Sequence, residues 1–172
     1  MKKTFKMLIG LSAALSAVSC AEEPKSEFKY LIDEFADLKI MKYQVPGWDE
    51  LSLQQKEYIY HLGEAAKYGR DIIWDQNCKY NLPIRHTIEA ILENYKGDKT
   101  SEDWKNFEVY AKRAFFSNGI HHHYAEDKFF PECPQEYFQS LMAAVGDEPK
   151  CAELIPVIYD PAIFPARKDM HT

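Results

Sequence analysis

The sequence lacks the motifs that most enzyme sites require. It holds only seven glycines among its 172 residues, and they form no phosphate-binding loop. No Gly-x-Ser-x-Gly turn of the serine hydrolase type is present either. The formal net charge is -6, so nucleic acid is a poor partner, because phosphate binding needs a basic face. These absences exclude a chain that carries complete catalytic machinery of a familiar kind.

Cysteine is also scarce and lacks a metal-binding pattern. Beyond Cys20 the chain has Cys78, Cys133 and Cys151. Their separations match no Cys-x-x-Cys zinc or redox motif. Three thiols allow at most one disulfide and leave at least one thiol free. We interpret them as small, partly buried apolar residues, with their pairing left open.

The N-terminus has the pattern of an export signal. Lys2, Lys3 and Lys6 form a positive start, and Met7 to Val18 is an uncharged run rich in Leu and Ala. This run is too short to span a bilayer comfortably and has the length of a signal peptide's apolar segment. We therefore expect an exported protein.

The residues that end this segment are Ala17-Val18-Ser19-Cys20. They resemble the lipobox of bacterial lipoproteins, in which the signal is cut before a cysteine that becomes acylated. Residues 1–19 are then a signal peptide, and residues 20–27 a lipidated tether anchored to a membrane through Cys20, on the periplasmic or cell-surface side. The alternative is an ordinary signal peptide with an incidental cysteine.

The remaining chain, residues 28–172, has enough apolar residues for a core, since 46% of the sequence is hydrophobic. Helical spacing of apolar residues predicts a mainly α fold of about five helices. The segment Ile120 to Phe130 lacks a helical stripe and predicts one short strand or hairpin. The expected helices cover residues 28–40, 53–74, 83–95, 102–117 and 134–145, with a shorter element around Leu154 to Tyr159.

Two groups of apolar residues are expected to pack against another element or another polypeptide. On the second expected helix, one stripe carries Ile59, Leu62, Ala66, Gly69 and Ile73. A glycine on such a stripe suggests that another element packs closely there. Near the C-terminus, several apolar residues are followed by little further chain, so we expect them to need cover from outside it. They are Val157, Ile158, Tyr159, Ile163 and Phe164.

The one conspicuous cluster of possible metal ligands is His121-His122-His123. In a strand, His121 and His123 would share one face and could bind zinc. Asp127, Glu126 or Cys133 would have to supply a third ligand. The alternative is that these histidines are polar scaffold residues beside a turn. The absence of clear metal-ligand spacing favours this alternative.

Several short strings, in their order and spacing, resemble one family. They are Tyr60-His61-Leu62, Ala65-Ala66, Tyr68-Gly69, Phe107-Glu108-Val109-Tyr110, Phe116-Ser117-Asn118-Gly119 and Asp127-Lys128-Phe129-Phe130-Pro131. Together they are similar to the N-terminal part of the dipeptidyl peptidase III family of zinc metallopeptidases. Asp71-Ile72-Ile73-Trp74-Asp75-Gln76 and the three histidines resemble the bacterial members. The likeness runs from about Leu38 to about Lys168.

The resemblance implies a fragment rather than a complete enzyme. Complete members are two-lobed enzymes that remove dipeptides from peptide N-termini, with zinc ligands in a HExxGH helix and a later glutamate-rich helix. No histidine here is followed by glutamate, so no catalytic or zinc-binding residue transfers. Residues 28–172 would then be an N-terminal helical part of the lower lobe, incomplete at its C-terminus, binding neither zinc nor peptide alone. The alternative is a self-standing lipoprotein that serves as a binding or structural module.

Overall fold

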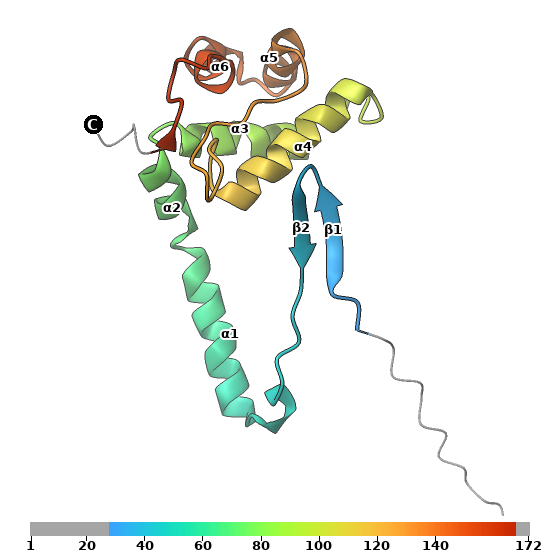
Figure 1. The fold of residues 1–172 in the computed structure, drawn as a ribbon, viewed down its shortest axis with the longest axis vertical. Coiled ribbons are helices and arrows are strands. Elements are labelled where there is room, and N and C mark those ends of the chain that lie inside the picture. Colours follow the sequence, from blue (N-terminus) through green and yellow to red (C-terminus); the bar gives the residue numbers. More distant parts are fainter. Residues whose placement is uncertain (1–27, 168–172) are drawn as a thin grey trace, which may run out of the picture.

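The computed structural model describes residues 28–167, and the expected signal peptide, Cys20 and the tether lie outside this range. The described part is mainly α-helical, as predicted, and it includes one two-stranded antiparallel sheet, which lies in a different segment from the predicted strand or hairpin (Figure 1). Counting α1 and α2 as one interrupted helix gives five helical segments, of which four match expected helices and the fifth, α6, matches the shorter element expected near the C-terminus. The elements are β1 (Leu31–Phe35), β2 (Leu38–Met41), η1 (Trp48–Glu50), α1 (Leu53–Lys67), α2 (Arg70–Asn77), α3 (Asn81–Asn94), α4 (Glu102–Ser117), α5 (Gln135–Ala144), η2 (Glu148–Lys150) and α6 (Cys151–Tyr159).

The first predicted helix, residues 28–40, is wrong, because this segment forms the β1–β2 hairpin. Phe35 pairs with Leu38 across a tight turn, and Ala36 in that turn has a left-handed φ of 49°. Glu34 and Lys39 are directly opposed and form an ion pair at 3.7 Å. The apolar residues of this segment suggested a helical period, but a tight turn and cross-strand pairing decide for strands.

The second predicted helix begins as expected but ends early. Ser52 accepts the N–H of Gln55 at 3.3 Å, and the Gln55 side chain accepts the N–H of Ser52 at 2.9 Å. This is a complete capping box. The helix was expected to run to about Trp74, but α1 ends at Lys67 and α2 begins at Arg70. The interruption includes Gly69, a residue whose conformational freedom weakens helices.

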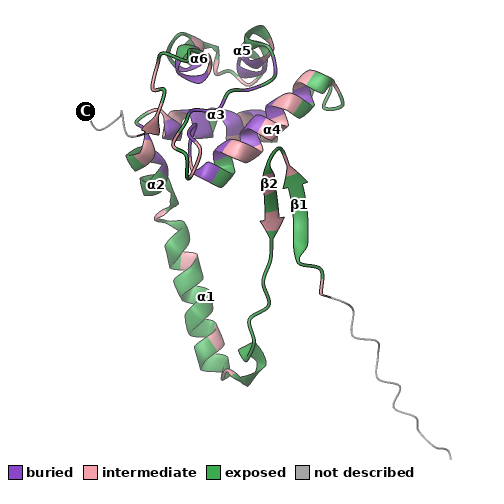
Figure 2. Cartoon of the chain, in the orientation of Figure 1, coloured by how far each residue is buried: buried purple, intermediate pink, exposed green. Residues whose placement is uncertain are grey.

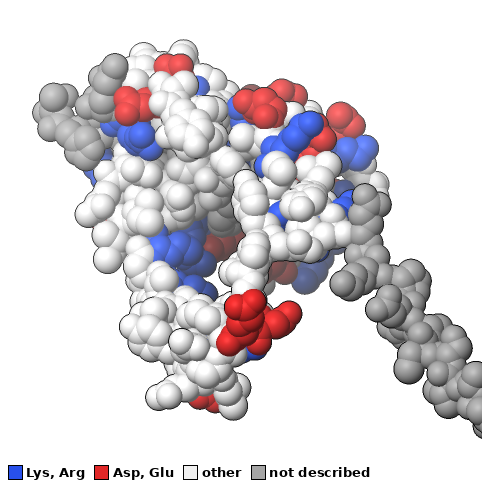
Figure 3. Space-filling view, turned by 60° about the horizontal axis from the view of Figure 1, so that its bottom comes forward, with Lys and Arg blue, Asp and Glu red and all other residues white. Residues whose placement is uncertain are grey.

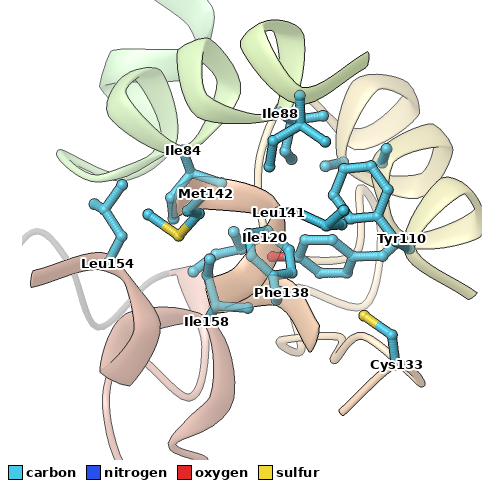
Figure 4. Close-up of a cluster of buried hydrophobic side chains, with 14 of the residues drawn as sticks. Ile84, Ile88, Tyr110, Ile120, Cys133, Phe138, Leu141, Met142, Leu154 and Ile158 are labelled. Atoms are coloured by element: carbon cyan, nitrogen blue, oxygen red, sulfur yellow. The ribbon is translucent and has the colours of Figure 1, made fainter. Parts of the chain in front are cut away.

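Helices α3, α4, α5 and α6 surround the hydrophobic core (Figure 4). Ser101 begins α4 by accepting the N–H of Trp104 at 3.2 Å, and Asn118 ends it with a left-handed φ of 53°. The predicted short element near the C-terminus is the helix α6, with Pro156 inside it. Core residues that are fully enclosed include Ile84, Ile88, Ile91, Phe107, Ala114, Ile120, Phe138, Leu141 and Met142.

The apolar residues near the C-terminus are covered by this chain itself, so the expectation that they need an outside partner is wrong. Val157 and Ile158 are buried in the core. The ring of Phe164 lies 5.5 Å from that of Tyr80, and the ring of Tyr159 lies 6.2 Å from that of Phe138. The chain after α6 folds back over the core, which sequence periodicity alone does not reveal.

The molecule divides into two parts with different burial (Figure 2). We call residues 74–167 the core and residues 28–73, which hold the hairpin, η1, α1 and the start of α2, the arm. No residue of α1 is buried, although Ile59 and Leu62 belong to its apolar stripe. The hairpin approaches α4 through two ion pairs, Asp33 with Lys112 at 3.1 Å and Asp37 with Arg113 at 3.0 Å. Over residues 28–167, no helix is both long enough and apolar enough to cross a membrane.

Candidate functional site

The histidine cluster lies in the loop between α4 and α5, which we call the histidine loop (residues 120–130). The predicted strand or hairpin is reduced here to one antiparallel bridge, between His121 and Lys128. A second bridge joins Asp127 to Ala166. The N–H of His122 donates to the carbonyl of Asp127 at 2.7 Å and closes the loop. The histidine loop is therefore a tight turn held against the C-terminal segment.

His121 and His123, the two candidate zinc ligands, contact different parts of the chain. His121 is buried, and its Nε2 lies 2.8 Å from the carbonyl oxygen of Phe164. The ring of His123 lies 4.8 Å from the ring of Phe116 on α4 and is stacked at 4.4 Å on the ring of His122. These contacts are those of packed scaffold residues.

Two of the three proposed third ligands, Glu126 and Cys133, have other partners. Glu126 pairs with Arg167 at 3.4 Å, and the Cys133 thiol lies 3.5 Å from the hydroxyl of Tyr159. Across the described part of the chain, no group of three or more His, Cys, Asp or Glu side chains is placed to hold a metal ion. The residues present do not fit a zinc site, so we derive no reaction step through zinc.

His122 and His123 have different surroundings in the histidine loop. Nδ1 of His122 accepts the backbone N–H groups of Tyr124 at 3.2 Å and Ala125 at 3.0 Å, which requires that nitrogen to be unprotonated. Burial lowers the pKa of His123, and the neighbouring His122 lowers it further, while Asp37 on the hairpin opposes the shift. His123 therefore favours its neutral form, and it lies close to Asp37, where the arm meets the core.

The most completely bonded polar residue of the histidine loop is Lys128, which sequence reasoning did not single out. Its ammonium donates to the carbonyls of Val157 at 2.7 Å and Ile163 at 2.8 Å, and also to that of Asp160. Burial lowers the pKa of Lys128. Its three hydrogen bonds satisfy carbonyls at and beyond the end of α6, which is a structural role. The only sequence signal is a lysine directly before two phenylalanines.

A second buried cation, Arg85, joins the arm to the core. Its guanidinium bonds to Asp71 at the start of α2 and to Glu89 at 2.8 Å, and it lies over the ring of Trp74. The pKa of Asp71 is lowered, mainly by the hydrogen bond from Arg85. Nothing in the spacing of these residues predicts the contact, because it depends on how α2 crosses α3.

The three cysteines of the described chain are free thiols. Cys78 and Cys133 are buried, and Cys151 is partly buried. Burial raises the pKa of all three thiols, which lowers the fraction of the reactive thiolate. None of them is in the electropositive, accessible setting of a nucleophilic cysteine.

The largest unexplained feature is an apolar face of α1. We call it the α1 stripe. Its side chains are uncharged and solvent-exposed, and they follow each other at helical spacing. In Figure 3, the lower part of the molecule shows a broad uncharged surface beside a cluster of acidic side chains. The residues of the α1 stripe are Gln55, Tyr58, Ile59, Leu62, Ala65 and Ala66.

Comparison with known proteins adds no assignment. No protein-family model matches the chain, and no curated protein matches it. Function must therefore be inferred from the residues and contacts of this molecule.

Proposed function

We propose that this chain forms the helical base of a zinc-dependent dipeptidyl peptidase, of the type that the dipeptidyl peptidase III family represents. In this proposal, a further polypeptide segment supplies the zinc ligands and covers the arm. The reaction is hydrolysis of peptides with release of dipeptides from their N-termini. The observation that carries the proposal is the exposed α1 stripe.

The spacing of the stripe is that of a helix-packing seam. Gln55, Ile59, Leu62 and Ala66 recur at intervals of four, three and four residues, the pattern by which helices pair side by side. Helices in globular proteins usually bury such a stripe against another element. The small residues at its C-terminal end would let a second helix approach closely. A helix from another polypeptide segment would satisfy this surface.

The strings that resemble the peptidase family lie in both the arm and the core, and this supports the proposal. The string Tyr60-His61-Leu62 lies on α1 in the arm, whereas Phe107 to Tyr110 lies on α4 in the core. The chain's own residues would bind no zinc and move no proton in the reaction. They would hold the two parts of the lobe in position through the ion pairs of Arg85, Lys112 and Arg113.

The DNA downstream tests the proposal directly. We expect it to encode, in this or another frame, a segment with HExxGH and a glutamate-rich zinc helix. Co-expression of both products should give zinc-dependent cleavage of dipeptidyl arylamides, whereas the mature chain alone should give none. Leu62→Lys on the α1 stripe should weaken assembly with that product, and Tyr124→Ser, an exposed aromatic of the core, is the matched control. Zinc-dependent turnover by the chain alone would contradict the proposal.

The alternative is a self-standing lipoprotein module. One observation favours it: the core encloses its own apolar residues, including those of α6. An unrelated gene downstream, together with cooperative melting of the mature chain as a monomer, would support this alternative. In either case we propose that Cys20 is the lipid attachment site of an exported bacterial protein. Labelling of cells with a radioactive fatty acid should then mark the wild type and fail to mark Cys20→Ala.

A further inference from the structure

The end of the arm farthest from the core carries apolar side chains that the described chain leaves uncovered. We call residues 43–53, which include η1, the arm tip. Tyr43 is 77% exposed, Val45 is 66% exposed and Leu53 is 72% exposed. Trp48 is also exposed, and Lys56 lies over its ring at 5.9 Å. These apolar residues come before the α1 stripe in the chain.

The arm is tethered closely to the expected lipid anchor. Phe28 lies beside the strand that leads into the tip, since the Lys42 ammonium is 5.1 Å from its ring and the N–H of Lys42 donates to the carbonyl of Tyr30 at 2.9 Å. Phe28 follows Cys20 by only eight residues. Such a segment spans at most about 28 Å when fully extended. A lipid on Cys20 therefore keeps the start of the arm within that distance of the bilayer surface.

We infer that the arm tip inserts Tyr43, Val45 and Trp48 into the lipid interface beside the acylated Cys20. Tyrosine and tryptophan suit this interface, because each has an apolar ring and one hydrogen-bonding group. The charged residues of the tip are Asp49 and Glu50, and Lys42 and Lys56 flank it in the sequence, so the lipid that fits is zwitterionic rather than anionic. The inference rests on the proposed lipidation of Cys20.

Tryptophan fluorescence reports on the tip selectively. The chain has three tryptophans, of which Trp74 and Trp104 are buried, so a change in solvent exposure would fall on Trp48. The probe is a vesicle of phosphatidylcholine and phosphatidylethanolamine, mixed with the unlipidated mature chain that carries Cys20→Ser. We expect a blue shift of the emission and flotation of the protein with the vesicles. Val45→Asp should lower the vesicle-bound fraction at least roughly tenfold, and Tyr124→Ser, which changes an exposed aromatic of the core, should leave it unchanged.

The other possible results distinguish the inference about the arm tip from the proposal about the lipid anchor. Absence of the blue shift, or equal flotation of wild type and Val45→Asp, overturns the inference. So does a blue shift that appears without vesicles as protein concentration rises, because it assigns the tip to a protein partner. Fatty-acid labelling of Cys20 is scored independently. Labelling without vesicle insertion keeps the lipid anchor and rejects the tip, whereas insertion without labelling supports the tip and rejects the anchor.

Discussion

Helices α1 and α3 are built alike but buried differently. They have 15 and 14 residues, and both carry isoleucine and leucine at helical spacing. In α3 the apolar face is enclosed, and Ile84, Ile88 and Ile91 are inaccessible to solvent. In α1 the corresponding face is open, with Ile59 43% exposed and Leu62 51% exposed. The capping box and the residue propensities set where α1 forms, whereas packing against another element decides whether such a stripe is buried.

The core and the arm also differ in the contacts that hold them in place. The core is held by apolar packing, while the arm is attached chiefly through ion pairs of Asp33, Asp37 and Asp71 with cations of α3 and α4. Ion pairs at the surface usually contribute at most about 1 kcal/mol each. Local stability should therefore fall from the core to the arm, and the arm is the part that a partner would order.

The largest expected difference comes from one substitution made in both parts. Ile88→Ala removes an enclosed core side chain and should lower the free energy of unfolding by about 2–5 kcal/mol. Ile59→Ala, on the exposed α1 stripe, should change it by no more than about 0.5 kcal/mol. Urea unfolding of both variants measures the difference. Equal losses would mean that the α1 stripe is buried in solution, for example against a second molecule.

Two glycine-to-alanine substitutions should change the stability by smaller amounts and in opposite directions. Gly119 has a φ of 149°, and a Cβ there would lie 2.1 Å from the Asn81 side chain, which accepts the N–H of Ile120 at 3.2 Å. Gly119→Ala should cost about 1–3 kcal/mol, the range for strain and overpacking. Gly63 lies within α1, and a Cβ added to it would have open space around it to 4 Å, so Gly63→Ala should stabilise the helix by about 0.5–1 kcal/mol. Thermal melting monitored by circular dichroism tests both signs.

A smaller loss of stability is expected when the ion pairs that attach the arm are removed. The double variant Lys112→Ala, Arg113→Ala removes both ion pairs between α4 and the hairpin and should cost about 1 kcal/mol or less in global stability. Its main effect should be faster amide hydrogen exchange in β1 and β2, with α3 unchanged. Lys105→Ala, which removes an exposed ion pair within α4, is the control. Unchanged exchange in the hairpin would show that packing rather than charge attaches the arm.

Local signals in the sequence located most helices. Ser52 with Gln55, Ser101 and Asn118 each mark a helix end where the structure places one, because these residues act through their own neighbouring backbone. The hairpin was missed, since Phe28, Leu31, Ile32 and Phe35 fit a helical spacing while the turn depends on Ala36 adopting a left-handed conformation. The early end of α1 was missed because glycine weakens a helix without fixing where it stops.

The candidate site shows where sequence reasoning runs out. The three adjacent histidines were evident, but their partners, Phe116 and Phe164, come from α4 and the C-terminal segment. Lys128 and Arg85 were not singled out, because a buried cation is recognised by the carbonyls and carboxylates that surround it in space. Likewise, the residues of α6 were expected to be exposed, and only the packing of α6 against α5 and the core shows otherwise.

The smallest expected effect is a pH dependence where the arm meets the core. Burial and His122 hold the pKa of His123 below 6.5, so the unfolded chain binds a proton more readily than the folded chain in this range. The resulting stability is present above pH 6.5 and is lost as the pH falls through the lowered pKa of His123. The groups that act on this ring are His122, Asp37 of the hairpin and Arg167, and Phe116 packs against it.

Urea unfolding at pH 7.5, 6.5 and 5.5 should show wild type losing more stability than His123→Asn, while His61→Asn on exposed α1 should follow wild type. Parallel curves for wild type and His123→Asn would remove His123 as the cause and leave the pH dependence to the carboxylates.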